Sequence, residues 1–214
     1  MVTKRAGGYL IMQQEILPLF SSPVMISTET YPMEKSLYDH IMNMPKEENT
    51  GGGENLITAD SRVLDNPEFK NLRAFIERYL GYYVKDVMKV NDKNEIYITQ
   101  SWINYNKTNT SHHVHSHPNS IISGVFYIEG EDAPIEFHRQ DKLLDLNLIH
   151  DEWNIWNSSQ WNLDMIKNKL FLFPSKLIHG VAPNESEKLR VSLSFNTFVK
   201  GEIGSVKQKT WAQI

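Results

Sequence analysis

The chain has 214 residues, 40% of them hydrophobic and 11% aromatic, so it is long enough to bury the core of one globular domain. Its formal net charge of -4 argues against non-specific nucleic-acid binding, which needs a basic surface. Cysteine is absent, which excludes disulfides and thiolate zinc sites, so a metal ion would need histidine, carboxylate or carbonyl ligands.

At the N-terminus, polar residues interrupt the apolar run that follows Lys4 and Arg5, and we expect no signal peptide there. No apolar stretch approaches the roughly 20 residues that span a bilayer, so we expect no membrane partner. The absence of cysteine is typical of a reducing compartment, and a cytoplasmic location is the expectation.

Two helices are predicted in the first half of the chain. Pro32 suits the first turn of one helix and Pro45 ends it, while Asn66 and Pro67 begin a second helix that Gly81 ends or kinks. The apolar positions at helical spacing are Met33, Leu37, Ile41 and Met44 in the first helix, and Phe69, Leu72, Ile76, Tyr79, Tyr83 and Val87 in the second.

After Asn94 the hydrophobic pattern changes to a period of two, which predicts strands in "EIYITQSWINYN", "SIISGVFYIEG", "PIEFHRQ", "KLFLFPS", "LIHGVAP" and "LRVSLSFNTFV". Residues 141–168 are polar, rich in Trp and Asn, and read as an insertion or a lid. Helices followed by short strands indicate an α+β chain with an antiparallel sandwich or barrel. We expect a single domain over residues 1–214, with helical support over about 30–92 and a β core over about 95–200.

Half of the histidines lie in "SHHVHSHPNS", residues 111–120. If this stretch is extended, His113, His115 and His117 share one face and His112 points the other way. Imidazoles at positions i and i+2 of a strand can converge on one metal ion. A solvated histidine cluster is the alternative, and this stretch alone leaves the choice open.

A second polar constellation lies in "LIHGVAPNESEKLRVSLSFN". His179 and Arg190 are near mirror images about the Pro-Asn-Glu-Ser turn, so an antiparallel hairpin would bring them together across its ladder. Arg190 shares a strand face with Ser192, Ser194 and Asn196. This face either lines a cavity that binds an anion or belongs to an ordinary surface strand, and the stretch alone leaves the choice open.

These elements together resemble the 2-oxoglutarate/Fe(II)-dependent dioxygenases, whose fold is a double-stranded β-helix. The closest resemblance is to a small subfamily that reads "H-x-H-P-x-S-x-x-S-G-x-Y-Y" and then "F-P-S-x-x-x-H-x-V"; this chain has "HSHPNSIISGVFYI" and "LFPSKLIHGVAPNESEKLRVSLSFN". The resemblance covers roughly residues 97–199. It implies a jelly-roll, cupin-like barrel with N-terminal supporting helices.

The resemblance implies that His115, His117 and His179 hold Fe(II), with His113 as an alternative ligand. Here the chain departs from the wider superfamily, because no Asp or Glu follows two residues after any histidine of the cluster. His117 would then occupy the place of the usual carboxylate. A site in which only His115 and His179 bind the ion, with water completing the shell, stays open.

By the same resemblance, Arg190 binds the far carboxylate of 2-oxoglutarate, since its planar fork suits a carboxylate. Further expected co-substrate contacts are Ser192, Tyr105, Tyr127, Asn104 and Ser123. The implied reaction takes O2 and 2-oxoglutarate, releases succinate and CO2, and hydroxylates a prolyl or other peptidyl side chain or a small metabolite. Two alternatives are a three-histidine cupin-type enzyme that does not use 2-oxoglutarate and a non-catalytic, metal-containing binding module.

Overall fold

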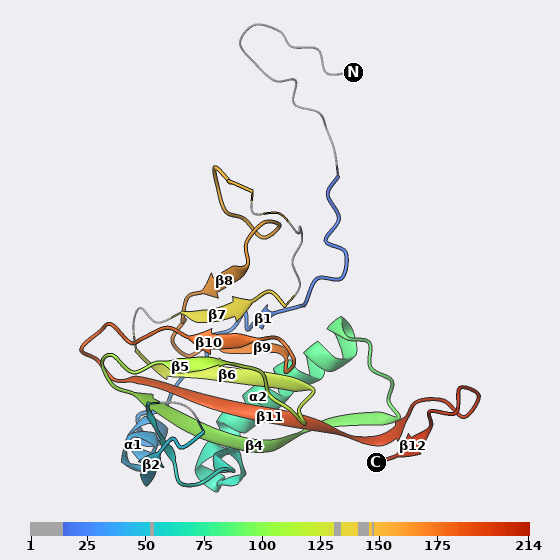
Figure 1. The fold of residues 1–214 in the computed structure, drawn as a ribbon. Helices are drawn as coiled ribbons and strands as arrows, with labels where there is room; N and C mark the ends of the chain where they lie inside the picture. Colours follow the sequence, from blue (N-terminus) through green and yellow to red (C-terminus); the bar gives the residue numbers. More distant parts are fainter. Residues whose placement is uncertain (1–14, 52–53, 131–133, 141–145, 147) are drawn as a thin grey trace, which may run out of the picture.

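A computed structural model describes residues 15–51, 54–130, 134–140, 146 and 148–214 of the protein (Figure 1). The expected lid over residues 141–168 therefore falls partly outside the described residues, as does the start of the N-terminal segment. The fold is mostly β-sheet with few helices. Among the described residues, no helix is both long and apolar enough to cross a membrane.

The larger of two sheets has eight strands and carries the long central pair of the fold. Its order is β1 (Met25–Ile26), β9 (Leu170–Pro174), β6 (Ile122–Glu129), β11 (Arg190–Ile203), β4 (Asn94–Asn106), β3 (Leu56–Thr58) and β2 (Lys46–Glu48), with β12 (Ala212–Gln213) pairing with β11. All of its pairings between neighbouring strands are antiparallel. In β11 against β4, Arg190 lies opposite Asn106 and Ser192 lies opposite Asn104.

The smaller sheet has four strands in the order β5 (His112–His115), β10 (His179–Val181), β7 (Ile135–His138) and β8 (Gln160–Leu163). His179 lies opposite His115 on one side and Phe137 on the other. The prediction of strands from period-two patterning is confirmed for β4, β6, β7, β9, β10 and β11. The sequence pattern missed the short strands β1, β2, β3, β8 and β12.

Alternation along the strands of the larger sheet divides its two faces between two hydrophobic clusters. Phe126, Val191 and Leu193 point to a cluster with the helices, whereas Val125, Tyr127 and Phe173 point to a second cluster shared with Ile135 and Phe137 of the smaller sheet. The two sheets therefore pack face to face, as in a jelly roll. Gly124 is required by this packing, because a Cβ atom there would lie 2.2 Å from the Phe195 ring.

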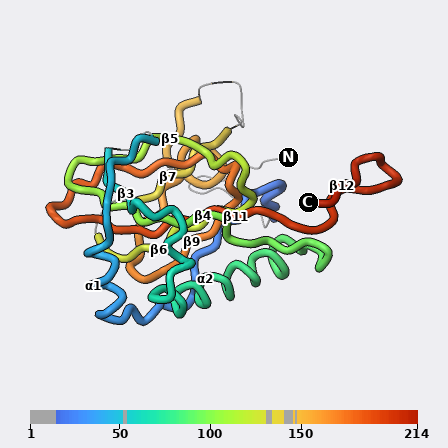
Figure 2. The backbone as a smooth tube through the Cα atoms, turned by 90° about the horizontal axis from the view of Figure 1, so that it is seen from below, coloured from blue at the N-terminus to red at the C-terminus, as the bar shows by residue number. Residues whose placement is uncertain are grey.

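Helices cover the outer face of the larger sheet, as Figure 2 shows for α1 (Lys35–Asn43) and α2 (Lys70–Tyr82). The predicted helix starts were too early. The helix predicted from Pro32 begins at Lys35, and Pro67 opens a short 3-10 turn, η2 (Pro67–Phe69), which follows η1 (Val63–Asp65). Gly81 does not end the second helix, which continues through Tyr82 into a π-helical turn, η3 (Tyr83–Val87).

Candidate metal centre

A pocket lies between the two sheets and is lined by polar side chains from both. Four histidines line its wall from the smaller-sheet side: His112, His115, His117 and His179. The larger sheet contributes Trp102, Asn104, Asn106, Ser123, Tyr127, Arg190, Ser192 and Ser194. The pocket thus brings together the two constellations that the sequence places far apart.

The loop that follows β5 presents His117 to the pocket. Its backbone is fixed by hydrogen bonds from His117 N to Ser175 O (3.0 Å) and from Ile121 N to Thr197 O (3.1 Å). Asn119, at the turn of this loop, adopts the left-handed conformation (φ 56°), which asparagine tolerates better than most residues. The loop is therefore anchored to both neighbouring segments, and the position of His117 is defined by the backbone.

Each of the three histidines His115, His117 and His179 has its Nδ1 atom engaged by an oxygen. His115 Nδ1 lies 2.7 Å from His113 O, and His179 Nδ1 lies 2.8 Å from Leu177 O. His117 Nδ1 lies 2.6 Å from Asn196 Oδ1. Because these oxygens only accept hydrogen bonds, each Nδ1 carries the proton, which leaves each Nε2 with a lone pair for a metal ion.

The separation of the imidazole nitrogens fits a shared ion. The ligand atoms of the three residues all lie within 4.8 Å of one another, and the Nε2 atoms of His115 and His117 are 3.0 Å apart. Two nitrogens bound at adjacent positions of one ion, each at about 2.1 Å from it, stand about 3 Å apart. Two facing lone pairs at this distance repel each other unless a cation or a proton lies between them.

Burial disfavours a proton between the two Nε2 atoms as the way to relieve this repulsion. It lowers the pKa of His117 to about 4 and that of His179 to about 3, and it also lowers the pKa of His115. All three rings are thus neutral near pH 7, the state in which imidazole binds metal. The chemistry of the donor set fits a divalent transition-metal ion.

His112 and His113 depart from the expected alternation. The sequence pattern placed His112 on the opposite face from His113, His115 and His117, but His112 lines the pocket whereas His113 is exposed. The cause is a register shift, in which His115 and His112 of β5 pair with His179 and Val181 of β10. Three positions of β5 thus span two positions of β10, and this bulge turns His112 inward.

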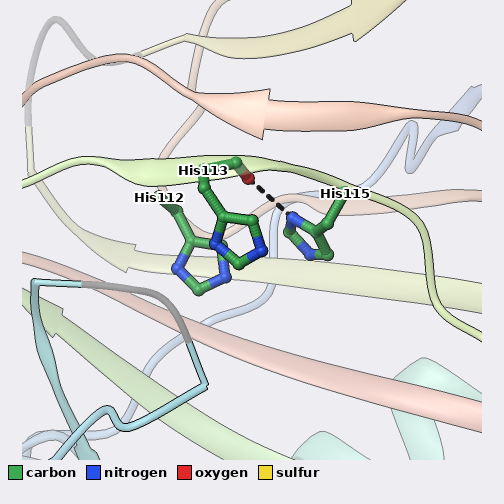
Figure 3. A group of neighbouring side chains, drawn as sticks. All are labelled: His112, His113 and His115. Atoms are coloured by element: carbon green, nitrogen blue, oxygen red, sulfur yellow. Dashed lines mark hydrogen bonds between the residues drawn. The ribbon is translucent and has the colours of Figure 1, made fainter.

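A second group that could hold an ion consists of His112, His113 and His115, whose ligand atoms also lie within 4.8 Å of one another. Figure 3 shows these three rings next to one another along β5, with the His113 carbonyl bonded to His115 Nδ1. This group includes the alternative ligand His113. It shares His115 with the first group.

Arg190 lies in the larger sheet's wall of the same pocket. The residue is only 2% exposed, and among the residues that the structure describes no carboxylate lies within salt-bridge distance of its guanidinium. Its one side-chain hydrogen bond among these residues runs from Nη1 to Ala182 O, at 3.4 Å. Burial lowers its pKa to about 10, so it remains charged near pH 7. A buried cation without an anion is costly, and the site is suited to an acidic ligand.

Uncharged donors surround Arg190. Asn106, opposite Arg190 in the sheet, is 2% exposed, and its Nδ2 atom has no hydrogen-bond partner within the described part of the chain. Ser192 and Tyr127 line the pocket as well, and burial raises the pKa of the Tyr127 hydroxyl, which keeps its proton. Asn104 and Ser123 also line the pocket, but Asn104 donates to Ser194 and Ser123 donates to Asn196. This buried amide N–H can donate a hydrogen bond to a ligand oxygen in this region.

One expected co-substrate residue is placed elsewhere. Tyr105 points to the opposite face of β4, where it is buried in the cluster with the helices and donates a hydrogen bond to Ile41 O at 2.6 Å. The expectation that Tyr105 contacts the co-substrate was wrong, because alternation along β4 directs Asn104 and Asn106 into the pocket and Tyr105 away from it.

The expected hairpin between His179 and Arg190 is also corrected. β10 pairs with β5 and β7, whereas β11 pairs with β4 and β6, so the two residues belong to different sheets. They nevertheless line one pocket, because the sheets face each other. The expected division of β11 is confirmed: Arg190, Ser192 and Ser194 line the pocket, while Val191, Leu193 and Phe195 pack toward the helices.

Sequence reasoning missed four pocket residues or their partners. Asn106 could have been found by continuing the alternation from Trp102 through Asn104. Trp102 is half-buried with its ring near-parallel to that of His117 (interplanar angle 21°), and no sequence signal indicated this contact. The inward turn of His112 and the contact of Asn196 with His117 depend on a bulge and on tertiary packing, respectively.

Residues 100–196 match a family described as "Putative 2OG-Fe(II) oxygenase", where 2OG stands for 2-oxoglutarate. All the histidines and the arginine of the pocket lie within this segment. The match and the fold support a 2-oxoglutarate-dependent oxygenase. No curated protein matches the chain.

Several solved structures share the fold at low sequence identity. HygX from Streptomyces hygroscopicus, with nickel, 2-oxoglutarate and hygromycin B bound, has a TM-score of 0.57 at 10% identity, over 83% of either chain. A Pseudomonas putida prolyl-4-hydroxylase has a TM-score of 0.52 at 11% identity, over 82% of this chain and 93% of its own. An oxidoreductase of the 2OG-Fe(II) oxygenase family from Burkholderia pseudomallei has a TM-score of 0.51 at 10% identity, over 82% of this chain and 84% of its own.

Proposed function

We propose that the chain is an Fe(II)- and 2-oxoglutarate-dependent hydroxylase, with residues 1–214 forming one domain around a closed double-stranded β-helix. The observation that carries the proposal is the pairing, in one pocket, of three convergent neutral imidazoles with a buried guanidinium that lacks an anion among the described residues. A dicarboxylate that chelates a metal ion at the imidazoles with one end and pairs with the guanidinium through the other would satisfy both groups.

His115, His117 and His179 would hold the iron. This set is favoured over the group of His112, His113 and His115, because His113 is exposed and lies outside the pocket wall. When bound, Fe(II) with 2-oxoglutarate supplies the activation of O2, coupled to decarboxylation of the co-substrate to succinate and CO2. A metal centre of three neutral ligands keeps its full positive charge, which favours a dianionic co-substrate.

Arg190 would bind the far carboxylate of 2-oxoglutarate. Its fork accepts a carboxylate in a bidentate pair, which explains how a guanidinium tolerates burial at 2% exposure. The Nδ2 of Asn106, which has no partner among the described residues, and the hydroxyls of Tyr127 and Ser192 add hydrogen bonds around the same group. These residues orient the co-substrate, and the apolar walls at Val125 and Phe173 keep water away from it.

The substrate would enter beside Trp102, a partly exposed ring of the pocket wall that is stacked on His117. A prolyl or other peptidyl side chain and a small metabolite are both compatible with this opening. The similar solved structures do not distinguish these two substrate classes, since HygX is bound to hygromycin B and the Pseudomonas putida protein is a prolyl-4-hydroxylase.

An anaerobic titration with Fe(II) followed by 2-oxoglutarate tests the proposal. The chelate is expected to give a weak visible charge-transfer band, and admission of O2 is expected to release succinate in the presence of an acceptor substrate from a peptide and metabolite panel. Metal binding without the band would favour a three-histidine enzyme that does not use 2-oxoglutarate. Absence of iron binding would refute the metal centre itself.

A further inference from the structure

The three proposed ligands differ in what holds their Nδ1 protons. His115 and His179 each donate to a backbone carbonyl two residues earlier in the chain, at His113 and Leu177. A backbone oxygen of the same strand or turn is present whatever the side chains are. His117 alone donates to a side chain, the amide oxygen of Asn196 on the opposite sheet.

Asn196 Oδ1 is in turn the end of a chain of hydroxyl groups. Ser123 Oγ donates to it at 2.9 Å, Ser175 Oγ lies 2.8 Å from Ser123 Oγ, and Ser120 Oγ lies 2.7 Å from Ser175 Oγ. Because the Ser123 proton is used on Asn196, Ser175 Oγ donates to Ser123 Oγ. Ser120 Oγ, the last hydroxyl of the chain, donates to Ile122 O at 3.3 Å. Asn196 is oriented with its amide oxygen, not its NH2 group, toward both His117 Nδ1 and Ser123 Oγ.

The backbone around Asn196 is anchored to the neighbouring segments. The pairing of β11 with β4 shifts register between Asn196 and Thr197, and Thr99 Oγ1 donates to Asn196 O at 3.2 Å. Thr197 N donates to Ser120 Oγ at 3.2 Å, which ties the first serine of the hydroxyl chain to the same strand. A bulge of this kind commonly re-aims a side chain beside a functional site.

We propose that Asn196 is a positioning residue that selects the metal-binding tautomer of His117, the histidine that stands where a carboxylate is usual. The inference rests on the proposed function only for the identity of the ligand set. Without an acceptor at Nδ1, His117 would place its proton on Nε2 and donate it to His115 Nε2, which is 3.0 Å away. That hydrogen bond would consume the lone pairs of two ligands at once.

The test compares Asn196→Leu, which removes the acceptor at similar size, with Asn196→Asp, which keeps an oxygen there. Asn162, an exposed asparagine on β8, provides the matched control Asn162→Leu. Two-bond 1H–15N spectra of the metal-free protein report which nitrogen of His117 carries the proton. We expect Nδ1–H in the parent chain, in N162L and in N196D, and Nε2–H in N196L. The same tautomer in N196L as in the parent chain would overturn the proposal.

Metal affinity gives the second measurement, with Co(II) alone as the probe. Loss of an outer hydrogen bond to a ligating histidine typically weakens metal binding about 10- to 100-fold. We expect that loss in N196L, recovery in N196D and no change in N162L. Equal weakening in N196L and N196D would mean that the site is merely disrupted, and would refute a role in tautomer selection. Since no co-substrate is present, these results are independent of whether the protein turns over 2-oxoglutarate.

Discussion

His179 and Arg190 belong to different sheets of the protein and line the same pocket, the first from β10 and the second from β11. The turn between them therefore carries the chain across the gap between the sheets. One short segment delivers a proposed metal ligand to one wall and a buried cation to the other. Because metal binding and co-substrate binding are proposed on opposite walls, a substitution can perturb either one alone.

Substitution of Arg190 by Ala is expected to abolish succinate release while leaving metal binding intact. Loss of one partner of a buried charge pair costs about 2–5 kcal/mol, which corresponds to a roughly 30- to 5,000-fold rise in the dissociation constant for 2-oxoglutarate. Co(II) titration and the charge-transfer band measure the two properties separately. Turnover that persists in R190A without 2-oxoglutarate would contradict the proposed reaction.

The variant His117→Ala tests whether three histidines or only two bind the Fe(II) ion. We expect His117→Ala to lose most of its affinity for Fe(II), because the buried pocket offers no carboxylate among the described residues to replace the imidazole. His113→Ala is the control, since His113 is exposed and outside the pocket wall. Unchanged iron affinity in H117A would show that His115 and His179 suffice, and iron loss in H113A would favour the other histidine group.

Two tyrosines on opposite faces of the larger sheet form a matched pair of tests. Tyr127→Phe removes a hydroxyl from the pocket and is expected to raise the KM for 2-oxoglutarate several-fold. Tyr105→Phe removes the hydrogen bond to Ile41 O and is expected to lower the free energy of unfolding by about 1 kcal/mol with the KM unchanged. Denaturant unfolding and succinate-release kinetics on both variants check this separation. A raised KM in Y105F alone would reverse the assignment.

Asn106→Ala tests the buried side-chain amide of the pocket wall. A hydrogen bond to a charged group contributes about 1.5–3 kcal/mol, so we expect the KM for 2-oxoglutarate to rise about tenfold or more. Because Nδ2 of Asn106 has no partner within the described residues, its removal should cost the unliganded protein little stability. A large loss of stability with an unchanged KM would show that the amide is structural.

Local patterning predicted much of this site. The period-two alternation of side chains was enough to assign Arg190 and Ser192 to one face of β11 and Val191 and Leu193 to the other. Both faces of this strand are buried, and they differ in polarity. The alternation failed at His112, where a bulge in β5 interrupts the period. Tyr105 was expected in the site from the family resemblance, whereas alternation along β4 correctly places it on the face of the helices, where its hydroxyl donates to a helix carbonyl. The pairing of β10 with β5 and β7 joins distant segments, and no local pattern specifies it.

The position of β11 at the centre of the larger sheet limits how the chain can vary in length. Arg190 and Asn196 are an even number of positions apart on one continuous strand that is paired on both sides. A single inserted residue between them would turn one of the two side chains toward the helices. Related chains can therefore be expected to accept insertions in the connection before β11, but to keep the interval from the arginine to the asparagine constant.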